Sequence, residues 1–190
     1  RWGMGAATNG TFVLLVARAL AAGRWQNARE WALAADRLSG GSRTVRMQVA
    51  RVLVNFLADP AGWDPEARRS LGSLALSWCS GVDLAMQSLT EQSLRAHLEE
   101  MAHGIDAGAR VYRQALRADP SSGAIRNNLA YLISLAGGDL DEAVREARMA
   151  STLSPAGLPW YLETEAWARF LRGDTQAALR LERRAQRYWT

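Results

Sequence analysis

Residues 127–155 read NNLAYLISLAGGDLDEAVREARMASTLSP, and this stretch decides the fold. Its first half places apolar side chains three and four residues apart, which puts them on one stripe of a helix. These side chains are Leu129, Leu132, Ile133 and Ala136. Gly137 and Gly138 follow directly, and two successive glycines stop a helix. The pattern predicts a helix over 122–136 that ends at the glycines.

The second half of the stretch predicts another helix over 140–153. Asp139 can cap its N-terminus, and Pro155 prevents its continuation. Small residues share one face of this helix and allow a second helix to approach closely. They are Ala143, Ala147 and Ala150. A hairpin of this kind cannot bury its own apolar stripe, so it must stack on neighbouring helices.

The spacing of small and helix-breaking residues recurs along the chain. A glycine is followed by an alanine five residues later, by a second alanine seven further on and by a breaker five after that. The sets are Gly138, Ala143, Ala150 and Pro155; Gly173, Ala178 and Ala185; and Gly23, Ala28, Ala35 and Gly40. A further half-unit, 35 residues before the first set, contains Tyr112, Ala115 and Pro120. A fixed period of this length predicts a repeat protein.

These motifs resemble the tetratricopeptide (TPR) repeat family, most clearly over 118–190 and 9–40, and least over 43–103. The resemblance implies an all-α fold in which antiparallel helix-hairpin repeats stack as an α-solenoid. Apolar periodicity predicts about ten helices and no strand. The predicted helices are 9–22, 25–39, 43–58, 65–79, 83–103, 106–118, 122–136, 140–153, 158–172 and 174–188. We expect residues 1–8 to form a flexible tail and 9–190 a single TPR-like domain.

Composition excludes several classes of enzyme. All 23 basic residues are arginine, which rules out a Walker A lysine, a Schiff-base lysine and a pyridoxal phosphate anchor. The net charge of +4 is too small to argue for nucleic acid by itself. The apolar run from Phe12 to Ala17 is far shorter than the roughly 20 residues of a membrane span, so we expect this segment not to contact a membrane.

Two features of the sequence bear on disulfide bonding and on processing: the single cysteine and the first residue. Cys79 cannot form an internal disulfide, and its apolar surroundings predict a core position. The chain does not begin with methionine, so we expect a fragment or a processed form. The compartment stays open between cytoplasm and periplasm.

Candidate catalytic chemistry is sparse. Glu100 and His103 form one Glu-x-x-His element of the kind that di-iron helix bundles use, but such a site needs a second copy. His97 is the one other histidine, and it lies on a different side of the same predicted helix. We therefore predict no metal site, no cofactor, no small-molecule substrate and no enzymatic activity.

The TPR resemblance implies a binding face. In that family the first helix of each pair lines a concave groove, and an asparagine before the conserved leucine often bonds the backbone of a bound peptide. Here the leucine is Leu129. The binding residues that follow are Asn127, Asn128, Tyr131, Trp160, Thr164 and Trp167, with Glu163 beside them. A core role for the tryptophans is the alternative.

Three departures from the family pattern qualify this binding face. Glu165 stands where the last unit should have its buried leucine. The extra residue in Ala136-Gly137-Gly138 leaves the register between the units open by one position. The lysines of the family's carboxylate clamp are missing, so chaperone C-terminal tails are not expected as ligands.

The function that follows is a non-catalytic protein–protein interaction scaffold, whose concave face binds a peptide or a partner protein. The alternative is a helical-repeat RNA binder, because pentatricopeptide repeats also recur at 35 residues and arginine is abundant.

The C-terminal helix leaves two modes of association open. Arginines cluster on its final turns and two aromatic residues follow them. The arginines are Arg180, Arg183, Arg184 and Arg187. In the first mode Leu181 and Ala185 pack on Trp167 and Phe170, so that the helix caps the array. In the second, the terminal aromatic residues mediate a weak homodimer.

Overall fold

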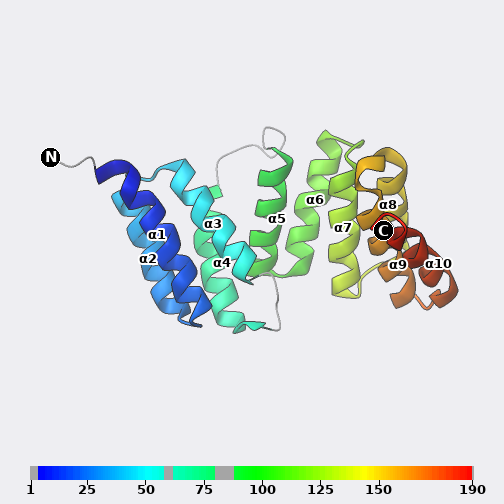
Figure 1. The fold of residues 1–190 in the computed structure, drawn as a ribbon, viewed down its shortest axis with the longest axis horizontal. Coiled ribbons are helices and arrows are strands. Elements are labelled where there is room, and N and C mark those ends of the chain that lie inside the picture. The colour runs from blue at the N-terminus through cyan, green and yellow to red at the C-terminus, as the bar shows by residue number, and fades with distance from the viewer. Residues whose placement is uncertain (1–3, 58–61, 80–87, 190) are drawn as a thin grey trace. The chain divides into compact units, whose positions relative to one another are not determined.

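The protein is described by a computed structural model over residues 4–57, 62–79 and 88–189 (Figure 1). These residues contain ten α-helices and no strand, which confirms the predicted all-α fold class. The helices are α1 (Met4–Ala21), α2 (Trp25–Leu38), α3 (Arg43–Leu57), α4 (Pro65–Cys79), α5 (Leu89–His103), α6 (Ile105–Ala118), α7 (Gly123–Ala136), α8 (Leu140–Leu153), α9 (Leu158–Leu171) and α10 (Thr175–Gln186). A 3₁₀ turn, η3 (Pro155–Gly157), joins α8 to α9.

Two helices begin several residues away from their predicted starts. α1 begins at Met4, five residues before its predicted start. α5 begins at Leu89, and the predicted segment 83–87 lies outside the described residues. The turn η3 was not predicted; its first residue, Pro155, has a fixed φ angle that suits a tight turn.

The chain forms two compact units, and each is described by itself. Unit 1 contains residues 1–82 and 97–103, and unit 2 contains residues 83–96 and 104–190. Helix α5 contributes residues to both units. The single domain expected over 9–190 stays a prediction.

Unit 1 contains α1 to α4 and the C-terminal part of α5. α1 packs on α2 and α3, and α3 packs on α4. A Cβ atom at Gly72 of α4 would lie 2.8 Å from Cβ of Met101, so only glycine permits this approach to the end of α5. Arg68 donates through Nη2 to both carboxylate oxygens of Glu100 at 3.0 Å. The carboxylate of Glu100 is therefore partly buried and held in an ion pair.

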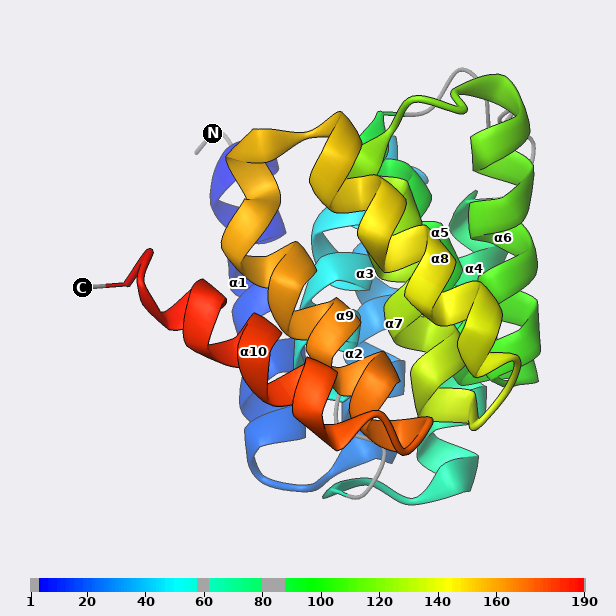
Figure 2. The ribbon, with the colours of Figure 1, turned by 90° about the vertical axis from the view of Figure 1, so that its right-hand side faces the viewer.

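Unit 2 contains the repeated helix pairs. α7 packs on α8, α9 packs on both of them, and α10 packs on α9 (Figure 2). One cluster of buried side chains joins α7, α8 and α9 to α6 and to the middle of α5. Its members are Ala96, Ala109, Val111, Tyr112, Ala115, Ile125, Leu129, Ala130, Leu132, Ile133, Ala143, Val144, Ala147 and Ala168. The small residues predicted at the helix contact are thus core residues.

The turn between α7 and α8 has the predicted chemistry. Gly137 has a φ angle of 61°, in the left-handed region that favours glycine. The amide of Gly138 donates to the carbonyl of Ile133 at 3.1 Å. Oδ1 of Asp139 accepts from the amides of Asp141 and Glu142, at 3.0 Å each, so the expected cap is present.

Candidate partner-binding surface

Two helix pairs of unit 2, α7–α8 and α9–α10, can be compared position by position because they repeat at 35 residues. Ala143 and Ala150 are buried on α8, and Ala178 and Ala185 are buried at the equivalent positions of α10. The inner contacts of the two pairs therefore match, as the sequence predicted.

The outer positions of the same two pairs differ in exposure. Leu132 and Val144 are 4% and 6% exposed, and they share the core cluster with Ala168 of α9. Their equivalents 35 residues later, Trp167 and Leu179, are 42% and 46% exposed. Helix α9 lies on α7 and α8, whereas no described helix of unit 2 lies on the equivalent face of α9 and α10.

This open face is hollowed into a groove of about 520 Å³ between α9 and α10. We call it the α9–α10 groove. It is lined by Glu163, Ala166, Trp167, Phe170, Thr175, Ala178, Leu179 and Glu182. Apolar side chains form most of the wall, and the charged residues among them are both carboxylates. A groove of this composition suits an apolar ligand surface flanked by positive charge.

One face of α9 carries aromatic side chains along the groove. Trp160 packs edge-on against Trp189, with 4.9 Å between the ring centroids. Trp189 also donates through Nε1 to Oε1 of Glu163 at 3.1 Å. Farther along the helix, Trp167 stacks on Phe170 at 6.0 Å. The aromatic rings are thus held by contacts with one another while they remain exposed.

On α7, the predicted binding residues divide between internal bonds and exposure. Nδ2 of Asn128 donates to Oγ of Ser93 on α5 at 3.3 Å, which links equivalent positions of successive repeats. Oδ1 of Asn127 is buried and makes no hydrogen bond within the described part of the chain. Tyr131 is 48% exposed. Tyr131 therefore offers the accessible surface of this group.

Tyr112 of α6 lies in the core beside this group. Burial raises the pKa of Tyr112 to about 12, and the neighbouring polar side chains of Ser93 and Asn128 offset only part of that increase. The hydroxyl is fully buried and lacks a well-aligned hydrogen bond in the described residues. It therefore remains neutral at physiological pH.

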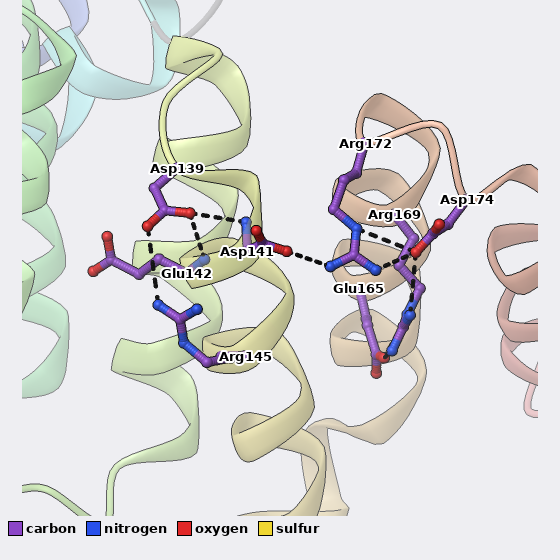
Figure 3. A network of polar contacts seen from close by, with 8 residues as sticks. All are labelled: Asp139, Asp141, Glu142, Arg145, Glu165, Arg169, Arg172 and Asp174. Atoms are coloured by element: carbon purple, nitrogen blue, oxygen red, sulfur yellow. Dashed lines mark hydrogen bonds and ion pairs between the residues drawn. The ribbon is translucent and has the colours of Figure 1, made fainter.

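On the other side of α9, a chain of ion pairs replaces an apolar contact (Figure 3). Glu165 is 5% exposed and, in the 35-residue register, occupies the position of the buried Ala130; the expected match to Leu129 is wrong by one residue, because Leu129 aligns with the buried Thr164. Its carboxylate accepts from Arg169 at 2.8 Å. Arg169 also pairs with Asp174 at 3.6 Å. Glu165 is a charged residue where the repeat pattern has a buried apolar one, and its charge is neutralised by Arg169 of the same helix.

The chain of ion pairs continues to α8. Arg172 pairs with Asp174 and, at 2.5 Å, with Asp141 in the first turn of α8. The hydrogen bond from Arg172 holds the pKa of Asp174 below its usual value. These contacts join the turn between α9 and α10 to the preceding repeat.

The six predicted binding residues differ in their exposure to solvent. Tyr131, Trp160 and Trp167 are exposed, Asn127 and Asn128 are partly buried, and Thr164 is buried. The groove also contains Phe170, Leu179 and Glu182, which the sequence analysis did not assign to binding. The 35-residue register is the signal that could have identified them, since it aligns Leu179 with the core residue Val144.

The expected contacts of the C-terminal helix need one correction. Ala178 and Leu179, rather than Leu181 and Ala185, line the groove with Trp167 and Phe170. Leu181 lies on the opposite side of α9, beside Glu165 and Arg169. The reason is the helical period, which turns Leu179 and Leu181 about 200° apart around α10.

In the described ranges, no group of three or more His, Cys, Asp or Glu side chains is close enough to hold a metal ion. None of the helices described has both the length and the apolar character needed to cross a bilayer.

The fold is similar to those of known repeat proteins. A MamA crystal structure covers 94% of this chain and 90% of its own, with a TM-score of 0.58 and 11% identity. MamA from MSR-1 covers 95% of each chain, with a TM-score of 0.56 and 14% identity. YrrB, a TPR protein with an unusual peptide-binding site, covers 92% of this chain and 82% of its own, with a TM-score of 0.54 and 12% identity.

No protein-family model matches the sequence, and no curated protein is significantly similar to it. The likenesses at these identities concern the fold, and the 35-residue repeat of glycine and alanine agrees with them. The chain has the all-α, helix-hairpin repeat fold of the TPR proteins.

Proposed function

We propose that this chain is a non-catalytic scaffold that binds a peptide or a partner protein on the concave face of its TPR-like repeats. The proposal assigns the contact residues to the first helices of two successive pairs, α7 and α9. They are Asn127, Asn128, Tyr131, Trp160, Thr164 and Trp167. The observation that carries it is the exposure of three large aromatic side chains from this set, Tyr131, Trp160 and Trp167.

Exposed aromatic residues of this kind suit recognition of a partner. Tyr and Trp bury a large area at low cost in side-chain entropy, and they are enriched among residues that dominate binding energies. The Trp160–Trp189 and Trp167–Phe170 contacts restrict the rings before binding. Pre-ordering of this kind lowers the entropy that association costs.

The less exposed members of the set have supporting roles. Asn128 already bonds Ser93 and fixes α7 against α5. Asn127 places an amide close to Tyr131 along the same helix, where its remaining polar atoms can serve a peptide backbone. Thr164 is buried and holds the position of α9. YrrB shows that a protein with this fold has a peptide-binding site.

Ion pairing of at least four of the thirteen arginines of unit 2 weakens the RNA alternative. Four arginines are each bonded to a carboxylate: Arg113 to Glu142, Arg126 to Glu146, Arg169 to Glu165 and Arg172 to Asp141. Phosphate binding depends on cations that are available to replace counterions. Paired arginines supply little of that attraction.

A selection from a random peptide library on the immobilised chain tests the proposal. We expect enriched peptides whose affinity falls about tenfold or more in Tyr131→Ala, since one buried aromatic anchor contributes at least that much. Tyr188→Ala is the matched control, because Tyr188 has a similar exposure and lies outside the proposed set. No enrichment, or equal binding by both variants, would contradict the assignment.

A further inference from the structure

The outer face of α1 is exposed and carries a single charge. Arg18 is the one charged residue of α1. Along its described surface, Thr11, Leu14, Arg18 and Ala21 are exposed at spacings of three, four and three residues. Leu14 is 70% exposed. Helices with apolar residues around most of their circumference are normally covered by another element.

The α9–α10 groove has the opposite property, because it is shaped to receive a helix. One repeat earlier, the equivalent surface of α7 and α8 is covered by α9, and Leu132, Val144 and Ala147 are buried there. The groove repeats these positions with Trp167, Leu179 and Glu182. A first helix of a further repeat is therefore the kind of element that this surface is built to hold.

The outer stripe of α1 and the groove are complementary in apolar character and in charge. Leu14 can contribute apolar area against Trp167 and Leu179. Arg18 follows one helical turn later, and the charged residues of the groove are Glu163 and Glu182. A positive charge beside an apolar stripe fits a groove whose charged residues are carboxylates.

We propose that the α9–α10 groove of one molecule binds α1 of a second copy of the same chain, in the way that α9 binds α7 and α8 within a molecule. The interface is heterologous, because each copy offers α1 from one surface and the groove from another. Each added copy leaves one α1 and one groove unused. Association therefore continues with rising concentration instead of stopping at a symmetric dimer.

Sedimentation velocity of the full chain over a wide range of concentration measures this association. We expect the average mass to rise continuously, and we expect Leu14→Glu and Leu179→Glu each to weaken association about tenfold or more, because each places a charge in the apolar contact. Leu38→Glu is the matched control, since Leu38 is 71% exposed on α2 and lies outside both surfaces. A wild-type chain that stays monomeric, or single variants that associate as the wild type does, overturn the proposal.

Mixing the two variants distinguishes this interface from a symmetric one. The Leu14→Glu copy keeps its groove and the Leu179→Glu copy keeps its α1, so the mixture should form a 1:1 dimer and stop there. Recovery of binding also shows that both variants are folded. A mixture that remains monomeric, or one that forms the same long assemblies as the wild type, contradicts a head-to-tail contact.

Charge reversal gives a second, independent measurement. Arg18→Glu and Glu182→Arg should each weaken association, and combining them in one chain should restore it, because opposite charges again face each other. Additive weakening in the double variant contradicts the proposed pairing. Tyr131→Ala should leave association unchanged, because Tyr131 belongs to the proposed peptide-binding set and does not line the groove, whereas Trp167 belongs to both.

Discussion

The helix pairs α7–α8 and α9–α10 share their inner contacts and differ on their outer faces. The alanines between the two helices of each pair are buried in both, because a close approach of the helix axes requires small side chains there. On the outer face, Leu132 and Val144 are buried in the first pair while Trp167 and Leu179 are exposed in the second. The motif thus determines the hairpin, and the next helix determines the burial of its outer face.

The largest expected effect contrasts Leu132 with its equivalent Trp167. Leu132→Ala should lower the free energy of unfolding by about 2–5 kcal/mol, because it leaves a cavity in the core. Trp167→Ala should lower it by less than about 1 kcal/mol at low protein concentration, where the groove is open. Urea unfolding followed by circular dichroism measures both. Equal losses would mean that Trp167 is covered in solution and that the two pairs do not differ.

The second contrast concerns Glu165 and Arg169, which stand at the positions of the buried Ala130 and Ser134 of the earlier repeat. Arg169→Ala should destabilise the protein by about 3 kcal/mol, because it leaves the buried Glu165 carboxylate without its partner. Glu165→Ala should cost much less, since it restores the alanine found at Ala130 and leaves Arg169 paired with Asp174. The same unfolding measurement distinguishes them. Equal losses would show that the ion pair itself stabilises α9.

The third prediction concerns the dependence of stability on pH. It contrasts Tyr112, which carries a phenol, with the equivalent residues of the next two repeats, Ala147 and Glu182, which do not. The pKa of Tyr112 is raised by burial to about 12. The unfolded chain loses this proton near pH 10 and the folded chain near pH 12, so stability should fall as pH rises between these values. Each pH unit in that window contributes roughly 1.4 kcal/mol.

Tyr112→Phe is the control for that pH dependence. Because phenylalanine does not titrate, the variant should lose about 2 kcal/mol less than the wild type between pH 10 and pH 12. Its stability at pH 7 should be close to that of the wild type, since the hydroxyl lacks a well-aligned hydrogen bond in the described residues. Parallel pH profiles would show that Tyr112 ionises as an exposed tyrosine does.

Much of the fold could be predicted from local residue chemistry. Glycines, caps and prolines act within a few residues, so the ends of α7 and α8 follow from Gly137, Asp139 and Pro155. The predicted start of α1 was wrong because the composition of this segment fits both a flexible tail and a helix. The burial of Glu165 could not be predicted, since it depends on the packing of α9 against α8, although Arg169 four residues later indicated a possible pair.

The candidate surface was less predictable than the fold. The sequence singled out Trp160 and Trp167 as either groove or core, and their exposure depends on whether another helix lies on α9. Leu179 and Glu182 were missed because an isolated repeat pattern treats α10 as a copy of α8. Comparison of the outer positions at 35 residues recovers them, because a glutamate at the position of buried Ala147 indicates a face that water or a partner reaches.

The smallest expected effect contrasts two aspartates that occupy the same position in the two pairs, Asp139 before α8 and Asp174 before α10. Oδ1 of Asp139 accepts two backbone amide hydrogen bonds at the start of α8, whereas the side chain of Asp174 makes no such cap bond and pairs with Arg172 instead. Asp139→Ala should therefore cost about 1 kcal/mol through loss of the cap. Asp174→Ala should cost less, and its effect should shrink with added salt because an exposed ion pair is screened. Unfolding of both variants at low and high salt measures the difference. A salt-independent loss in Asp174→Ala equal to that in Asp139→Ala would show that both aspartates cap their helices, and the two turns would then be equivalent in solution.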